Sequence, residues 1–329
     1  MLGAACVAVA ACGAGGVADS TRPGPTPASS VTFALAVPPL DPIRDGSYEA
    51  WLVSASGARA SLGRYADGAE RSVPLPSGTW TVVEVTVEPP ADADPMPSAQ
   101  TLLRGQLRDG RASLNIEGAV TQGMLPLREA PGQFTMFSPS DNEANGYPSH
   151  EEAGVWLFNM APASTVQKDY YVRLAQLQAG WQYEGWMVRD LGVPAAIWLS
   201  YGKFVPDWTG ALNRADDTGW GPYSGVTDFR TARLEDFPGD DWISNPLAFP
   251  WNPALPLPLD LREKDASGRL RWTHVISIEP ARDLGEPIAS ERPFVLRPYV
   301  DSFGDAGPGV ARTLTLRTSS IPTGTAELR

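Results

Sequence analysis

Apolar and polar residues alternate with a period of two along most of the first third of the chain. This alternation is typical of strands with one buried face, because successive side chains of a strand point to opposite faces. Gly, Pro and Asp residues interrupt the alternation and mark turns. The pattern predicts six short strands, at residues 31–37, 48–53, 60–65, 80–88, 101–107 and 112–116. Because no stripe of 3.6-residue period accompanies them, the pattern favours a β-sandwich.

Part of this pattern occurs twice. Three blocks recur later in the chain in the same order, namely YEAWLV (48–53) as YEGWMV (183–188), GRY (63–65) as GKF (202–204), and VTVEP (85–89) as ISIEP (276–280). Three matched blocks in one order indicate a tandem duplication. The second copy is the longer one, and its extra residues lie between the second and third blocks.

The repeat and the composition together predict the fold. A chain of 329 residues is long enough for two domains with separate cores. Its 32 Gly and 32 Pro residues favour turns over helices. We predict an all-β protein with two tandem antiparallel β-sandwich domains, at residues 31–127 and 128–329. Within the second domain we expect a long, loop-rich insertion at about 205–269.

Each matched hexapeptide contains one glutamate whose partner follows from the hairpin. If residues 56–57 form a tight turn, Glu49 lies opposite Arg64, so that an acid faces a base across two strands. The equivalent pair in the second copy is Glu184 and Lys203. The same turn predicts two further facing pairs, Trp51 with Leu62 and Val53 with Ala60.

These glutamates have a structural and a catalytic interpretation. Facing pairs of opposite charge contribute roughly 0.2–1 kcal/mol each, so we interpret Glu49 and Glu184 as residues that set the register of their strands. Glu88 and Glu279 end matched strands before a proline and are interpreted in the same way. The alternative is that one of them is a catalytic acid.

The first residues have the features of an export signal. Residues 1–11 form an apolar run of small residues that is too short to span a bilayer of about 30 Å. The run ends in VAACG, which resembles a bacterial lipobox, with Cys12 as the lipidated first residue of the mature chain. Residues 12–30 are rich in Pro, Ser and Thr, and we interpret them as a flexible tether. A buried apolar strand or helix is the alternative for residues 1–11.

Charge and cysteine content narrow the choice of partners. The net charge is −12 and no run of Lys or Arg occurs, which argues against nucleic acid because phosphate neutralisation supplies most of that affinity. The two cysteines, Cys6 and Cys12, both lie in the N-terminal segment. No disulfide is therefore available to the folded body.

Few residues point to catalysis or to a metal. Of the two histidines, His274 aligns with Val83 of the first copy and is expected inside a strand, whereas His150 is expected in a loop. The chain has no Cys/His zinc pattern, haem attachment motif or phosphate-binding glycine loop. We therefore expect no enzyme activity, no cofactor and no metal. The acidic residues at 92–94 and 216–217 lack the spacing of a Ca²⁺ loop, although Ca²⁺ binding by the insertion remains an alternative.

The insertion concentrates tryptophan among acidic residues. Tryptophans in loops serve as anchors at protein interfaces and as stacking platforms for sugars. We predict that the partner-binding residues are the tryptophans of the insertion, Trp208, Trp220, Trp242 and Trp251. Three alternatives remain: these indoles fill the domain's own core, they bind carbohydrate, or Asp216 or Asp240 supports a hydrolase.

The repeated blocks resemble those of a known family. A Y-E-x-W-L-V strand, a G-[RK]-[YF] strand, and a strand ending V-T-V-E-P before the Asp/Pro/Ser loop at 89–98 are similar to the extracytoplasmic domain of anti-sigma-K-type factors. The resemblance covers about residues 31–117, and again the second copy in two pieces. It implies a small β-sandwich in each copy. The sigma-binding segment and transmembrane helix of such factors have no counterpart here, so signalling is not implied.

Together these features predict a membrane-anchored extracytoplasmic lipoprotein of the periplasm. We expect a non-enzymatic binding or scaffold protein, an accessory or structural subunit that docks on the periplasmic face of a membrane protein complex. A respiratory or photosynthetic complex would be an example of such a host. The alternative is a lipoprotein that binds carbohydrate or a cell-envelope polymer.

Overall fold

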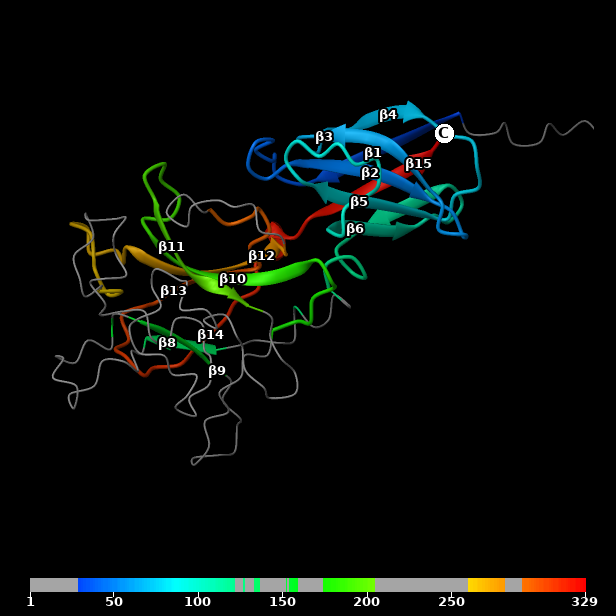
Figure 1. Cartoon of the computed structure of the whole chain (residues 1–329). Coiled ribbons are helices and arrows are strands. Elements are labelled where there is room, and N and C mark those ends of the chain that lie inside the picture. The colour runs from blue at the N-terminus through cyan, green and yellow to red at the C-terminus, as the bar shows by residue number, and fades with distance from the viewer. Residues whose placement is uncertain are drawn as a thin grey trace, which may run out of the picture.

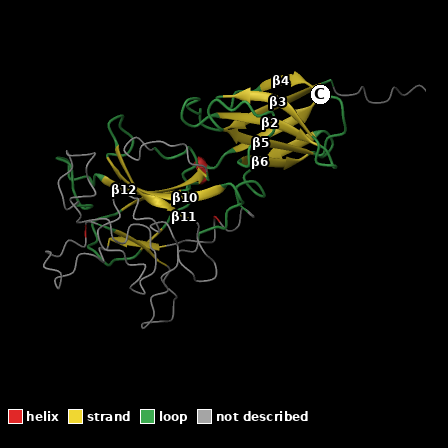
Figure 2. Cartoon of the chain, in the orientation of Figure 1, coloured by secondary structure: helices red, strands yellow, loops and turns green. Residues whose placement is uncertain are grey.

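The fold was analysed in a computed structural model, which describes residues 29–121, 127, 133–136, 152, 154–158, 174–204, 260–281 and 292–329. For residues 156–158 and 200–204 it describes the backbone alone. The described chain forms strands β1 to β15 in four antiparallel sheets, with one 3₁₀ turn at Thr318–Ser320. The prediction of an all-β fold is confirmed, and Figure 2 shows strands as the main regular structure of both halves.

Two four-stranded sheets form the first group, in the upper right of Figure 1. Their orders are β3-β2-β5-β6 and β4-β1-β15-β7. The strands are β1 (Ser30–Ala36), β2 (Ser47–Val53), β3 (Arg59–Tyr65), β4 (Arg71–Pro74), β5 (Val82–Glu88), β6 (Thr101–Gln106), β7 (Arg111–Leu114) and β15 (Thr323–Leu328). The six strands that the alternation predicts are all present, with ends that differ by at most two residues. The short strand β4 was not predicted.

The inner side chains of this group alternate with outer ones, as the sequence pattern requires. In β1 the buried residues Val31, Phe33 and Leu35 face the core, and in β5 every second residue from Val83 to Val87 does so. Burying each such side chain contributes about 1.5–3 kcal/mol. The core between the two sheets therefore holds the first group together without a disulfide.

The last strand of the chain belongs to the sheet of the first strand. β15 lies between β1 and β7, with Phe33 facing Ala326 and Glu327 facing Arg111 (Figure 1). The sequence analysis assigned this segment to the second sandwich, and the structure places it in the first group instead. The segment TGTAEL has only two apolar side chains, so its own pattern does not reveal the strand. Its long-range pairing decides its place.

The second group also contains two sheets, in the orders β11-β10-β12-β13 and β14-β8-β9. Its strands are β8 (Gln133–Met136), β9 (Val155–Phe158), β10 (Trp181–Arg189), β11 (Ile197–Phe204), β12 (Trp272–Pro280), β13 (Tyr299–Ser302) and β14 (Arg312–Thr313). The four-stranded sheet has the same order as β3-β2-β5-β6, with β10 in the place of β2 and β12 in the place of β5. We call these two the equivalent sheets.

The facing residues of the equivalent sheets also correspond. Glu49 lies opposite Arg64, and Glu184 lies opposite Lys203. A bulge follows in each hairpin, between Ala50 and Trp51 in the first and at the matching position in the second.

The predicted register is wrong between the turn and the bulge. Trp51 faces Ser61 rather than Leu62, and Val53 faces Arg59 rather than Ala60. The loop between β2 and β3 comprises residues 54–58, so the pairing next to the turn differs by one residue from the predicted one, and the bulge restores the predicted pairing at Glu49 and Arg64.

The two groups are in direct contact. The Trp181 indole N–H donates to the Thr101 carbonyl at 3.0 Å, and the Gln100 side-chain amide donates to the Gly180 carbonyl at 3.3 Å. Gly180 has a φ of +95°, and a Cβ there would lie 2.7 Å from the Ala99 carbonyl oxygen. One continuous cluster of buried apolar residues includes members of both groups.

Candidate functional site: the outer faces of the equivalent sheets

Each equivalent sheet has one face toward its own core and one outer face. In β2, Tyr48 and Leu52 belong to the core, whereas Glu49 and Trp51 project from the opposite face. In β10 the same division places Glu184 on the outer face. These two outer faces carry Glu49, Trp51 and Glu184, which the sequence analysis singled out.

Both outer faces contain the same buried tryptophan hydrogen bond. The Trp51 indole N–H donates to the Thr86 hydroxyl at 2.9 Å, and the Trp186 indole N–H donates to the Ser277 hydroxyl at 2.8 Å. A buried indole N–H needs an acceptor. The third block has Thr86 in the first copy and Ser277 in the second, and both side chains provide the hydroxyl acceptor.

The glutamates before the prolines hold the loops that follow. Both carboxylate oxygens of Glu88 accept from the Ser98 backbone N–H, at 3.1 and 3.2 Å. Both oxygens of Glu279 accept from the Phe294 backbone N–H, at 2.8 and 3.0 Å. Burial raises the pKa of Glu88. These contacts support the structural interpretation of both residues.

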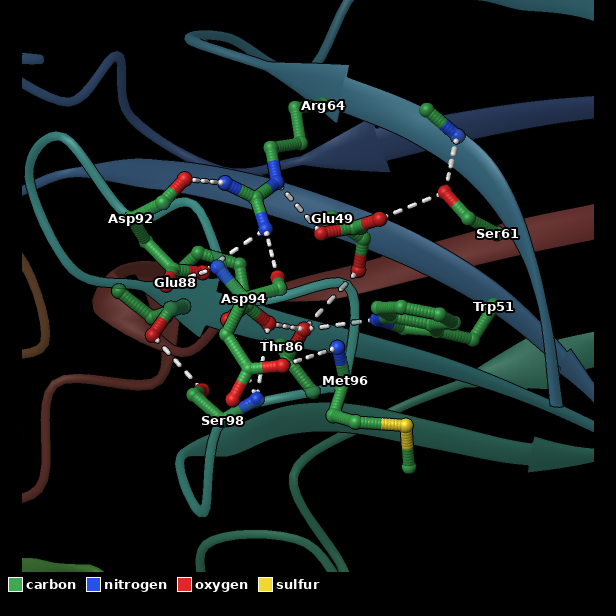
Figure 3. A network of polar contacts seen from close by, with 12 residues as sticks. Glu49, Trp51, Ser61, Arg64, Thr86, Glu88, Asp92, Asp94, Met96 and Ser98 are labelled. Atoms are coloured by element: carbon green, nitrogen blue, oxygen red, sulfur yellow. Dashed lines mark hydrogen bonds and ion pairs between the residues drawn. The ribbon is translucent and has the colours of Figure 1, made fainter.

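Figure 3 shows how the first outer face is connected to the loop at 89–98. The Arg64 guanidinium donates to Glu49 at 2.6 Å, to the carboxylate of Asp92 at 2.8 Å and to the Asp94 carbonyl at 3.0 Å. Glu49 also accepts from the Ser61 hydroxyl at 2.6 Å. The acidic loop is therefore bound to the sheet through one arginine, and its carboxylates are engaged in protein contacts.

A second set of charges lies across the first outer face. Glu84 is only 2% exposed and forms ion pairs with Arg59 at 3.3 Å and with Arg104 at 3.0 Å. Arg59 comes from β3 and Arg104 from β6, so the two cations reach Glu84 on the same face from either side of β5. We call these three residues the charged triplet.

At the same positions the second outer face is apolar. Val275 faces Val300 as Glu84 faces Arg104. Trp198 faces Val188 as Arg59 faces Val53. Trp198, Val275 and Val300 therefore occupy the positions of the charged triplet, and we call them the apolar triplet. The apolar triplet packs with Trp186 and Val188 into a separate small cluster, in which the rings of Trp186 and Trp198 are 6.0 Å apart.

A pocket of about 320 Å³ opens over the apolar triplet. Its lining consists of Pro38, Leu191, Trp198, Val275, Val295, Arg297, Val300, Arg317 and Ser320. The Arg297 guanidinium carbon lies 4.8 Å from the centre of the Trp198 ring, a cation–π contact. Arg297 also donates to the Phe294 carbonyl at 3.1 Å and to the Pro293 carbonyl at 3.3 Å.

The sequence analysis did not identify this pocket, although one signal of it was present. In the aligned third strands, Glu84 of the first copy corresponds to Val275 of the second. A change from acid to valine at an otherwise matched position marks a change in the chemistry of one face. The arginines of the pocket follow the strand in a region without a matched block, so alignment could not have found them.

His274 is an interior residue of β12. It faces Met187 as Val83 faces Leu52, in agreement with the predicted alignment. Its ring is packed 4.5 Å from the Phe134 ring, and burial lowers its pKa to about 3. The imidazole is therefore neutral at ordinary pH and has no access to a substrate.

Several predicted residues lie outside the described part of the chain. They are Cys12, His150, Asp216, Asp240 and the four tryptophans Trp208, Trp220, Trp242 and Trp251. For Lys203 the backbone alone is described. Among the described residues, no group of three or more His, Cys, Asp or Glu side chains could hold a metal ion. In the same residues, no helix is both long and apolar enough to cross a bilayer.

Comparison with known proteins gives no match: no family model, no curated protein and no solved structure is similar to this chain. The resemblance to anti-sigma-K-type factors therefore stays a prediction. The correspondence between the equivalent sheets is a property of this chain's own pairing and does not depend on that resemblance.

Proposed function

We propose that this chain is a non-enzymatic, membrane-anchored binding or scaffold protein of the extracytoplasmic side, which docks on another envelope protein. The observation that carries the proposal is the exchange of the charged triplet for the apolar triplet, at one register and with a pocket above it. Tryptophan and arginine over an apolar floor are the residue types that carry most binding energy at protein interfaces.

The described titratable groups support a binding role over catalysis. A general acid or base must reach its substrate and must titrate near the working pH. Glu88 and Glu279 are bound to backbone N–H groups, and Glu49 is paired with Arg64. His274 is buried and has a pKa of about 3. Each of these groups already has a structural role.

The membrane anchor and the partner class rest on the sequence. The apolar segment at 1–11, followed by Cys12, motivates a lipid anchor, and the tether at 12–30 would let the body reach a neighbour. We propose an integral membrane complex as the host, of which respiratory and photosynthetic complexes are examples.

Affinity purification from native membranes tests this proposal. The expected result is a co-purifying membrane protein, together with a lipid-modified N-terminal peptide that begins at Cys12. A parallel preparation with Val275→Glu is expected to lose the partner but to keep the lipid. A chain that extracts gently as a free monomer, with no partner in either preparation, would contradict the proposal.

A further inference from the structure

The pocket over the apolar triplet combines an apolar floor with basic walls. Val275 and Val300 lie on the floor next to the Trp198 ring, whereas Arg297 and Arg317 contribute two positive charges to the lining. The Ser320 hydroxyl donates to a backbone carbonyl at 2.9 Å and leaves its oxygen as an acceptor. A ligand for this pocket needs an apolar body and a negative charge.

Arg297 is the residue that most requires an anion. It is partly buried, and burial is the main cause that lowers its pKa from the ordinary arginine value. Within the described part of the chain, its polar contacts are two backbone carbonyls and the Trp198 ring, and no carboxylate forms an ion pair with it. A partly desolvated cation without a counterion is costly, so an anion in the pocket would be stabilised.

The nearest carboxylates do not satisfy that requirement. Glu279 and Asp45 are close enough to act on the charge of Arg297. However, Glu279 accepts two hydrogen bonds from the Phe294 backbone, and Asp45 forms an ion pair with Arg44 at 2.9 Å. Other arginines of the chain, which lie nearer the surface, are paired directly. Arg64 and Arg271, for example, each bind carboxylates within 3 Å.

We propose that this pocket binds a carboxylate carried on an aromatic or branched apolar body. The apolar body packs on Val275 and Val300 beside the Trp198 ring, and the carboxylate accepts hydrogen bonds from the arginines of the lining. A volume of about 320 Å³ lies at the small end of ligand pockets and suits one large side chain or one small aromatic acid. A free organic acid and the C-terminal residue of another chain share this chemistry.

This inference does not depend on the envelope partner proposed above. The pocket is formed by the described residues of this chain alone, whereas the docking proposal also needs the anchor and a host. Failure of the affinity purification would therefore not contradict ligand binding by the pocket. Absence of ligand binding would likewise not contradict docking on a co-purifying partner.

Isothermal titration calorimetry of the full chain tests the pocket. The probes are naphthalene-2-carboxylate and N-acetyl-alanyl-phenylalanine, with their amides as neutral controls and acetate as a control without an apolar body. Since a hydrogen bond to a charged group is worth about a tenfold change in affinity or more, at least one acid is expected to bind about tenfold more tightly than its amide. Binding of the first probe identifies a free acid as the ligand, and binding of the second identifies a chain terminus.

Variants distinguish binding of the acid in the pocket from its nonspecific attraction to positive charge elsewhere on the protein. Arg317→Gln is expected to weaken the acid about tenfold and the amide little, and Val275→Glu is expected to abolish binding. Arg111→Gln removes an exposed arginine of β7 that does not line the pocket, and this variant is expected to bind as wild type does. Because Arg317 is exposed, its variant decides the test even if Val275→Glu does not fold. Equal affinity for acid and amide, or no binding of either acid, would overturn the inference.

Discussion

On the outer face of the first equivalent sheet, Glu84 is paired with Arg59 and Arg104. At the same register of the second equivalent sheet, Val275 packs against Val300 and lies in one cluster with Trp198. The backbone pairing of the hairpins beneath both faces corresponds, down to the bulge in each. The two outer faces therefore differ in the chemistry of their triplet side chains, whereas the strands beneath them pair in a corresponding way.

The residues that the two sheets share have a different task. In both, a tryptophan indole bonds to a hydroxyl on the neighbouring strand, and a glutamate holds the following loop by its backbone. Buried polar groups must be satisfied within the fold, so these positions determine the architecture. The triplet positions hold a buried, paired charge in the first copy and apolar side chains in the second, so they are where a binding function can differ between copies.

The largest expected effect comes from deleting residues 323–329. The first equivalent sheet packs against a sheet in which β15 lies between β1 and β7, and removal of β15 exposes the edges of both neighbours. We expect the first group to lose cooperative folding, whereas β10 to β13 keep slow amide exchange. Hydrogen exchange with mass spectrometry measures this difference. Equal loss of protection in both groups would show that the two do not fold independently of each other.

The exchange of triplets can be tested by moving one onto the other sheet. Val275→Glu places a carboxylate in an apolar cluster and is expected to lower the free energy of unfolding by about 3 kcal/mol. Adding Trp198→Arg and Val300→Arg rebuilds the charged triplet and is expected to recover part of that loss. Urea denaturation measures both values. If the triple variant is no more stable than the single one, the two faces are not interchangeable.

The His274 position is occupied by Val83 in the first copy, which suggests a pH test. The pKa of His274 is about 3 in the fold, below the ordinary value near 6.5. The unfolded chain therefore binds more protons between these values, and stability is lost as the pH falls below about 6.5.

His274→Val removes this contribution. Between pH 7 and pH 5 we expect wild type to lose about 2 kcal/mol more than the variant. Thermal unfolding at several pH values measures the difference. Parallel curves for both proteins would contradict a neutral, buried imidazole, and Glu70→Gln on the surface serves as a control.

The smallest expected effect concerns the shared tryptophan hydrogen bond. Thr86→Val and Ser277→Ala each leave a buried indole N–H without its acceptor and are expected to cost about 1–2 kcal/mol. Similar losses in both copies would support equal roles for the two bonds. A loss in only one copy would show that the shared contact has lost its importance in the other.

Local patterns were a reliable guide to the strands of the first group. The period-two alternation of β1, β2 and β5 reflects one buried face, a property that each strand expresses by itself. The facing pair of Glu49 and Arg64 was also predicted correctly, but only because the bulge offsets a turn that was placed one residue away. The pairs between that turn and the bulge were predicted incorrectly, because neither the loop length nor the extra residue is visible in the alternation of a single strand.

The candidate site was harder to predict than the strands. The exchange of Glu84 for Val275 is visible in the alignment of the two copies. However, Arg297 and Trp198 are far apart in the chain, and their ring contact arises only when the segment before β13 crosses the outer face. No spacing of residues along the chain could predict this contact between Arg297 and Trp198.

By itself the sequence determined the all-β class, the repeated strand blocks and the facing positions of Glu49 with Arg64 and of Glu184 with Lys203. Alternation and block order are properties of neighbours along the chain, so they can be read without a structure. Only the tertiary structure decided that β15 completes the first group and that a pocket with two arginines lies over the apolar triplet. Both depend on long-range pairing, in which a weakly patterned segment takes its conformation from the strand or face against which it packs.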